Sequence, residues 1–291
     1  MRLLFTILLV LLPTGVGLQG ADVSDLTYTN NGAYVTITDC NASASGDLDI
    51  PAVIEQLPVR IIDNKAFLQC ARLTSITIPD GVTRIGNYTF YGCRSLVSIT
   101  IPQSVTSIGL TAFRDCTSLE SIIIPDGVTS IRHYTFYGCT SLESITIPAG
   151  VTSIGNFAFF GCSNLESITF FGNAPTLGGD AFSGLPEGAR AIIRDDAIGF
   201  GDRFGGLEVI TDTTGEAHRL KFRIGLTESG QVVLSFSAAV GSMYAIESSS
   251  DMRDWERLES EIAGAGDYVL RLFPASAKKR FFRLLEKGRG E

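Results

Sequence analysis

Hydrophobic and polar positions recur with a period of 23 residues through the middle of the chain. In one period Leu73, Ile76 and Ile78 are apolar, and the Ser and Thr residues that alternate with the isoleucines are polar. This alternation predicts a short strand over residues 75–78, with the isoleucines facing a core and the hydroxyl side chains facing out. Pro79 comes next, and because proline lacks the N–H that a strand ladder needs, we expect the strand to end there.

The second half of the period predicts a return of the chain to the core. A Pro-Asp-Gly sequence indicates a tight turn, after which Val82 and Ile85 face inward again and residues 86–90 round a far corner. The next three periods keep this spacing, with two departures: Ile123 stands where the neighbouring periods have Thr, and Arg132 stands where they have Gly.

A phenylalanine and, three residues later, a cysteine mark each period. The two columns are Phe67, Phe90, Phe113, Phe136, Phe159 and Phe182, and Cys70, Cys93, Cys116, Cys139 and Cys162. Leu185 occupies the next cysteine position, so the position requires apolar volume. Strands about 4.8 Å apart would place successive cysteines within reach of a disulfide, but parallel side chains and an odd number of cysteines favour free, buried thiols. Cys40 is out of register and is expected in an N-terminal cap.

One period cannot bury its own Leu, Ile and Phe side chains, whereas stacked periods share a continuous core. The sequence therefore predicts a mainly β fold, a solenoid of 23-residue turns over residues 45–210, with an N-terminal cap at 21–44 and a glycine-rich C-terminal cap at 199–206. Leu48 and Ile50 fit the strand positions of an irregular first turn once a five-residue insertion before Val59 is allowed.

The pattern Leu-x-x-Ile-x-Ile-Pro-x-x-Val-x-x-Ile-Gly-x-x-x-Phe-x-x-Cys resembles the BspA-type bacterial leucine-rich repeat, over roughly residues 45–210. The resemblance implies a leucine-rich-repeat solenoid in a secreted or cell-surface protein that binds host, matrix or neighbouring-cell proteins, as in adhesion. It does not indicate which ligand is bound.

The rest of the chain departs from the period. Residues 216–291 contain apolar runs, at 231–236 and 267–272, that predict short antiparallel strands. This segment resembles a small β-sandwich module found at the C-termini of many secreted bacterial proteins, and the polar residues 211–215 are the predicted linker.

The N-terminus carries the features of a secretory signal peptide. Arg2 precedes an apolar run over residues 3–12, which Pro13 and small residues follow. The run is too short to span a bilayer, so we predict that residues 1–20 are a leader, cleaved after Gly17 or Gly20, and that the mature protein is secreted or associated with the cell envelope without a transmembrane segment.

Composition argues against several classes of function. Residues 21–215 carry 10 Lys and Arg against 20 Asp and Glu, which makes a nucleic-acid partner a poor expectation, whereas residues 216–291 are nearly balanced, with 12 against 11. The two histidines, His133 and His218, fall in different predicted domains, and His133 is expected to be a solvated surface residue. We therefore predict no catalysis, no cofactor and no metal site.

Three sets of outward-facing residues are candidates for partner binding or for a plain solvent face. The corner aromatics are either interface anchors or packing between turns, and they are Tyr88, Tyr91, Tyr134, Tyr137, Phe157 and Phe160. The strand face is either a solvent face or a flat platform for an extended partner, and its column holds Thr77, Thr100, Thr146 and Thr169, with Ile123 between them. A carboxylate column, either screened by solvent or neutralised by a cation or a basic partner, consists of Glu120, Glu143 and Glu166.

The sequence thus predicts a monomeric extracellular binding protein whose solenoid presents a rigid surface to a protein or glycan partner. Two alternatives remain open: a structural spacer or coat component of the cell envelope, and an accessory module of a carbohydrate-active system. An acidic pair lining a cleft would favour the latter.

Overall fold

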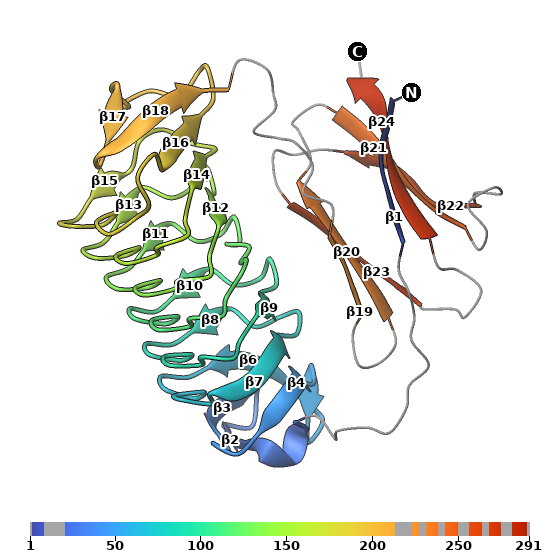
Figure 1. Cartoon of the computed structure of the whole chain (residues 1–291). Coiled ribbons are helices and arrows are strands. Elements are labelled where there is room, and N and C mark those ends of the chain that lie inside the picture. The colour runs from blue at the N-terminus through green and yellow to red at the C-terminus, as the bar shows by residue number, and fades with distance from the viewer. Residues whose placement is uncertain are drawn as a thin grey trace. The chain divides into compact units, whose positions relative to one another are not determined.

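The computed structural model describes residues 21–212 in full and, outside that range, the backbone of strands β1 (Arg2–Leu8) and β19 to β24. Contacts divide the chain into two units, Leu18–Thr213 and a second unit formed by Met1–Gly17 and Thr214–Glu291. The first unit is a β-solenoid, so the predicted mainly β solenoid is confirmed (Figure 1). In the described part of the chain, no helix has the length and hydropathy of a membrane span.

The N-terminal turns of the solenoid are irregular. A short 3-10 helix, η1 (Val23–Asp25), leads into the antiparallel pair β2 (Leu26–Asn30) and β3 (Val35–Cys40), and β4 (Ser45–Asp49) follows. In the parallel pairing of β4 with the next turn, Leu48 stands opposite Ile76, which confirms the predicted alignment. The five-residue insertion forms a hairpin between β5 (Val53–Ile54) and β6 (Leu57–Ile62).

The predicted strands stack into a first parallel ladder. Its members are β4, β7 (Arg72–Thr77) and β9 (Ser98–Thr100), and then β12 (Ser144–Ile147), β14 (Ser167–Phe170), β16 (Arg190–Ile193) and β18 (Leu207–Thr211). Ile76 and Ile78 are buried and Thr77 is half-buried, so the predicted strand faces are confirmed. At the following turn Val82 donates its N–H to the Pro79 carbonyl at 3.3 Å.

A second parallel ladder runs along the inward-facing Ile85 column, where the sequence predicted buried side chains but no strand, and its strands after β6 are two residues long. It comprises β3, β6, β8 (Arg84–Ile85) and β10 (Ser107–Ile108), and then β11 (Ser130–Ile131), β13 (Ser153–Ile154) and β15 (Thr176–Leu177).

Both ladders are interrupted at the same turn, between Cys116 and Cys139. In the first ladder residues 121–124 contribute an isolated bridge, from Ser121 to Ser98, and in the second β10 does not pair with β11. At the position after each short strand, Gly86, Gly109, Gly155 and Gly178 donate their N–H to an isoleucine carbonyl of the preceding turn at 2.7–3.0 Å. Of the described turns from Gly86 to Gly178, the one that holds Arg132 lacks this bond.

We call this interruption the seam, and the Cβ atom of Arg132 explains why the second ladder breaks there. A Cβ atom built on Gly155 would lie 2.6 Å from the backbone nitrogen of His133, so adjacent turns at this position approach too closely for a side chain. Arg132 carries a Cβ atom at the equivalent position, so its turn cannot approach the preceding turn as closely. The rings of Phe113 and Phe136, which face each other across the seam, stay stacked with centroids 5.5 Å apart.

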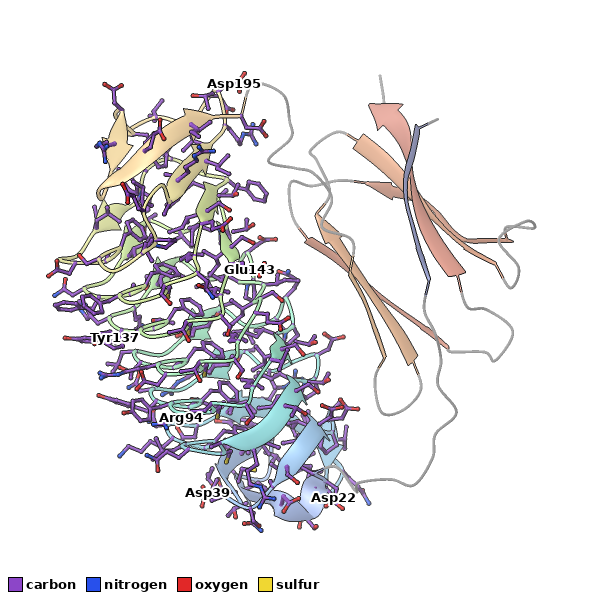
Figure 2. All side chains as sticks on the ribbon, viewed as in Figure 1. Asp22, Asp39, Arg94, Tyr137, Glu143 and Asp195 are labelled. Carbon is purple, nitrogen blue, oxygen red and sulfur yellow. The ribbon has the colours of Figure 1, made fainter. Side chains whose placement is uncertain are left out.

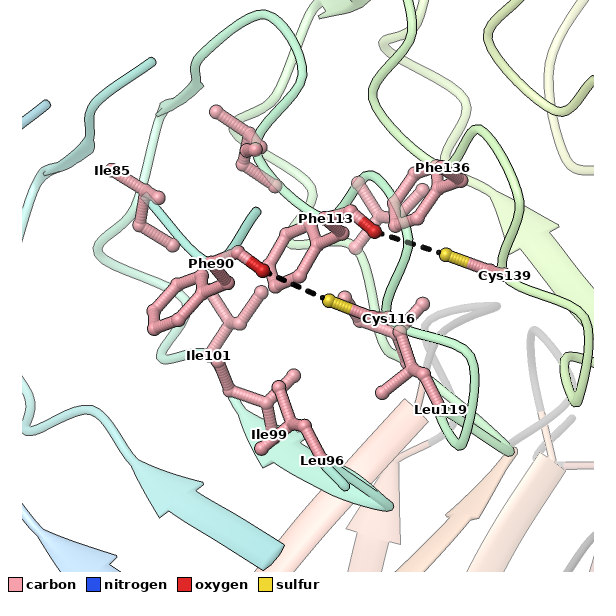
Figure 3. Packing of buried hydrophobic residues seen from close by; sticks show 14 of the residues in the cluster. Ile85, Phe90, Leu96, Ile99, Ile101, Phe113, Cys116, Leu119, Phe136 and Cys139 are labelled. Atoms are coloured by element: carbon pink, nitrogen blue, oxygen red, sulfur yellow. Dashed lines mark hydrogen bonds between the residues drawn. The ribbon is translucent and has the colours of Figure 1, made fainter. Parts of the chain in front are cut away.

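The core is built from the predicted columns (Figure 3). The five phenylalanines from Phe67 to Phe159 are fully buried and stack face to face. Each thiol from Cys93 onward donates to the carbonyl of the phenylalanine 26 residues earlier, at 3.0–3.1 Å. All six cysteines are free and buried, as the sequence favoured. A column of thiols thereby satisfies carbonyls that would otherwise be unpaired in a dry interior.

Aromatic rings close the C-terminal end of the solenoid. β17 (Arg203–Phe204) folds back antiparallel on β18, and Phe200 and Phe204 pack on Phe170 with ring centroids 5.2 and 5.4 Å away. Gly205 has a φ of 58°, and a Cβ there would lie 2.5 Å from the Phe182 ring, so glycine is the residue that fits. These rings cover the last turn of the core.

The second unit consists of two antiparallel sheets. One has the strand order β1, β24 (Phe281–Arg289), β21 (Ser242–Ser249), β22 (Glu256–Ala263), and the other β19 (Arg223–Leu226), β20 (Gln231–Ser237), β23 (Tyr268–Pro274). The predicted runs at 231–236 and 267–272 fall on β20 and β23. Packing of the two sheets into a sandwich, and cleavage of the leader that contains β1, stay predictions. His218 and most of the predicted linker lie outside the described residues.

Candidate recognition surface

The corner that connects the second ladder to the cysteine column is a third stack of backbone hydrogen bonds. Tyr88, Phe90 and Gly92 donate their N–H groups to the next turn at 2.8–3.0 Å, and this pattern repeats along the corner. Unlike the two strand ladders, it continues across the seam, where Thr111 donates to His133 and Phe113 to Thr135. The corner is therefore a rigid base for the side chains that it carries.

Two positions in each corner adopt a left-handed backbone conformation. The position before the cysteine has φ between 59° and 76° and holds glycine in four of six turns: Gln69, Gly92, Asp115, Gly138, Gly161 and Gly184. The position two residues before the buried phenylalanine has φ between 53° and 64° and never holds glycine: Lys65, Tyr88, Thr111, Tyr134, Phe157 and Asp180. A bulky residue at positive φ is an outlier that costs of order 1 kcal/mol or more. Three aromatic residues occupy this position, whereas the other left-handed position, before the cysteine, holds glycine in most turns.

The six predicted corner aromatics lie along this corner in two groups, which together we call the aromatic ridge. Tyr134 stacks on Phe157 with centroids 5.2 Å apart and planes inclined by 10°, and Tyr137 stacks on Phe160 at 5.0 Å and 10°. Tyr88 and Tyr91 pair at 6.4 Å in a tilted arrangement. The rings are half-buried except Tyr88, which is 38% exposed, and Leu68, also 38% exposed, extends the ridge by one turn. The rings therefore pack between turns, as one alternative predicted, and they also face solvent; their use as interface anchors stays a prediction.

Arg114 fills the gap between the two groups of rings, and sequence analysis missed it. It occupies the column of Tyr91, Tyr137 and Phe160, and its guanidinium carbon lies 4.4 Å from the centroid of Tyr137 and 5.7 Å from those of Tyr91 and Tyr134. A cation over aromatic faces is attracted by the ring quadrupole. The sequence pattern could have identified it, because Arg114 is the one basic residue in a column that otherwise holds Leu68, Tyr91, Tyr137 and Phe160.

The hydrogen-bonding groups of Arg114 are largely unused. Its Nε lies 3.5 Å from Oδ2 of Asp115, close enough for an ion pair but without hydrogen-bond geometry, so this buried Nε has no hydrogen-bond partner. The side chains of Arg114 and Asp115 are 33% and 31% exposed. The terminal guanidinium nitrogens make no hydrogen bond within residues 21–212. The ion pair between Arg114 and Asp115 contributes little to stability, because partly exposed pairs are worth at most about 1 kcal/mol.

Beside the ridge, side chains link successive turns. Asn87 accepts the Leu110 N–H at 3.0 Å, and Asn156 accepts the Gly179 N–H at 3.0 Å. His133 lies in the same column, and its Nδ1 accepts the Asn156 N–H at 2.8 Å. His133 is exposed, as predicted, but it also has a structural role that the sequence reading did not assign.

The strand-face candidates lie on a different face of the solenoid from the ridge. Thr77 pairs with Thr100, and Thr146 with Thr169, in the first ladder, and all four are half-buried. Figure 2 shows the labelled Tyr137 on one edge of the solenoid and Glu143 on the other. Glu120, Glu143 and Glu166 are exposed, and no salt bridge described in residues 21–212 involves them. The structure therefore separates an aromatic, cation-bearing edge from an acidic edge.

The cysteine column offers little reactive chemistry. Burial raises the pKa of the Cys93, Cys116, Cys139 and Cys162 thiols, in the last case to about 12, so thiolate is scarce at neutral pH. Cys40 lies at the base of the column, where the Cys70 thiol donates to its carbonyl at 3.7 Å. Contact between these two thiols raises the pKa of Cys40 and lowers that of Cys70. Among the described residues, no three His, Cys, Asp or Glu side chains cluster as metal ligands would.

Comparison with known proteins agrees with this geometry. Residues 60–187 match the family model for the BspA type leucine rich repeat region, in six copies. The leucine-rich repeat protein of T. pallidum is 27% identical, with a TM-score of 0.52, over 59% of this chain and 92% of its own. A leucine-rich cell surface protein from Faecalibacterium prausnitzii is 29% identical, with a TM-score of 0.50, over 74% of this chain but 57% of its own. No curated protein matches the chain. Its repeat region is thus similar, in sequence and in fold, to BspA-type leucine-rich repeat proteins.

Proposed function

We propose that the protein is a binding protein of the bacterial cell surface or exterior, and that its aromatic ridge docks a protein partner without catalysis. The observation that carries this proposal is the backbone at Tyr88, Tyr134 and Phe157, which holds bulky rings in a left-handed conformation. The backbone there would favour glycine or asparagine, so the rings are held at a local conformational cost. Half-exposed aromatic side chains on a rigid base are the usual anchors of protein interfaces.

The relatives support the location. The Faecalibacterium protein is described as a leucine-rich cell surface protein, and stacked repeats of this kind present extended surfaces that suit partner binding. Export through the predicted leader, a monomeric state and the absence of catalysis are parts of the same proposal.

The test is capture of extracellular proteins by the full chain and by a variant with Tyr88, Tyr134 and Phe157 all changed to Asn. Asparagine tolerates positive φ, so the variant removes the rings without adding backbone strain. The matched control changes Thr77, Thr100 and Thr146 on the strand face to Asn. We expect the ridge variant to lose its partner and the control to keep it. Equal capture by both variants would refute the proposal.

A structural spacer is the second candidate, because one observation favours it: the ring faces at Tyr134, Phe157, Tyr137 and Phe160 are satisfied by one another. A spacer requires the rings only for stability. In that case the ridge variant would lower the melting temperature, and neither it nor the wild type would capture a partner.

A further inference from the structure

We propose that the aromatic ridge recognises an acidic peptide segment, with Arg114 binding a carboxylate of that segment. This inference rests on the proposed function and adds the chemistry of the partner.

The stacking geometry determines which parts of the rings a partner can meet. Tyr134 and Phe157, and likewise Tyr137 and Phe160, each cover one face of the other, with planes inclined by only 10°. Along the side of each stacked pair a partner meets ring edges, which carry the positive part of the aromatic quadrupole. The hydroxyls of Tyr88, Tyr91, Tyr134 and Tyr137 make no hydrogen bond within residues 21–212 and are free to donate. Positive ring edges and hydroxyl donors suit an anion, whereas flat stacking of a sugar ring requires open faces.

Arg114 adds a cation with free donors at the centre of this surface. Its terminal nitrogens have no hydrogen-bond partner in the described solenoid, and Oδ2 of Asp115 lies 3.5 Å from Nε. Tyr91, Tyr134 and Tyr137 surround the guanidinium and fix its position. A preorganised planar guanidinium binds a carboxylate through two parallel hydrogen bonds, and the surrounding rings exclude part of the competing water.

The net charge of the segments that carry the ridge is positive, whereas the net charge of the whole solenoid is negative. The four corner segments that carry the ridge, residues 86–94, 109–117, 132–140 and 155–163, contain three arginines and one aspartate, against a twofold excess of acidic residues in 21–215. Arg94 lies on the same edge as Tyr137, and Glu143 lies on the opposite edge (Figure 2). Because exposed charges are screened beyond about 8 Å at physiological salt, the distant carboxylates do not cancel this local field.

The test measures binding of a blocked hexaglutamate peptide to the full chain, with hexaglutamine and hexalysine peptides of the same length as controls. We expect hexaglutamate to bind and hexaglutamine not to, and we expect binding to weaken as salt is raised. Arg114→Gln should reduce the affinity about tenfold, equivalent to about 1.4 kcal/mol. Arg114→Lys should keep the salt dependence and still bind more weakly, since it lacks the planar fork. Glu143→Gln, on the other edge, should change nothing.

The outcomes separate this inference from the proposed function. If hexaglutamate does not bind, or binds Arg114→Gln as tightly as the wild type, the assignment of an acidic peptide is wrong. Tighter binding of a hexagalacturonate oligosaccharide than of hexaglutamate would overturn the assignment in favour of an anionic glycan. Self-association of the protein that hexaglutamate inhibits would overturn it in favour of a second copy of this chain as the partner. Capture of a partner that the Asn ridge variant loses and Arg114→Gln retains would leave the proposed function standing and refute the role of Arg114.

Discussion

Two aromatic columns with the same period run along the solenoid, and they differ in what surrounds them. The inner phenylalanines stack at 5.2–5.8 Å and are almost fully buried, and the ridge rings Tyr134 and Phe157 stack at 5.2 Å while half-exposed. The inner column has one residue type throughout, whereas the ridge positions vary from Lys65 to Phe157. Similar stacking therefore stabilises the core where water is excluded. On the half-exposed ridge the residue type can vary, so those positions can serve partner recognition.

The largest effect should come from the inner column. Phe113→Ala removes a fully buried ring that stacks on two neighbours, so we expect the free energy of unfolding to fall by about 3–5 kcal/mol. Urea denaturation followed by circular dichroism measures it. Phe160→Ala, in the half-exposed ridge, is the matched control and should cost less than half as much. Equal losses would mean that the two columns contribute equally to stability.

Much of this contrast could be predicted from the sequence. The 23-residue period located the inner Phe and Cys columns and the outward-facing tyrosines, because burial depends mainly on the phase of each position within the repeat. The period could not predict the seam, since a single substitution at Arg132 acts through a close approach of two backbones. It also could not predict that Arg114 lies among three tyrosines, because that contact depends on side-chain geometry between turns.

The seam offers the next largest effect. Arg132→Gly lets the turn approach Gly109 and form the missing hydrogen bond to Ile108, and we expect about 1 kcal/mol of added stability or somewhat less, because glycine also loses backbone entropy on folding. Gly155→Arg is the reverse change and should destabilise, since a Cβ there would lie 2.6 Å from the His133 nitrogen. The midpoint of urea denaturation distinguishes them. A loss of stability in Arg132→Gly would contradict the proposed cause of the seam.

Tyr134→Asn should have a small effect on stability. The variant loses stacking on Phe157, worth about 0.5–1.5 kcal/mol beyond burial, and it relieves the strain of a bulky residue at a φ of 57°. We expect the two terms to cancel to within about 1 kcal/mol in thermal denaturation. A loss as large as that of Phe113→Ala would show that the ridge is a second core.

The smallest expected effect is the chemical modification of the buried thiols from Cys93 to Cys162 in the native chain. Burial raises the pKa of Cys93, Cys116, Cys139 and Cys162, so the thiolate that attacks iodoacetamide is nearly absent at pH 8 in the folded protein. Mass spectrometry should find these four unmodified in the native chain and modified in urea. Early modification of Cys116 would contradict a dry inner column.

The most direct measurement of the central claim is hydroxyl-radical footprinting of the chain, alone and with the partner that capture identifies. If the ridge is the recognition surface, oxidation of Tyr88, Tyr134 and Tyr137 should fall several-fold in the complex, while the strand face around Ile123 keeps its reactivity. Protection confined to the strand face, with the ridge tyrosines oxidised as in the free protein, would contradict the account.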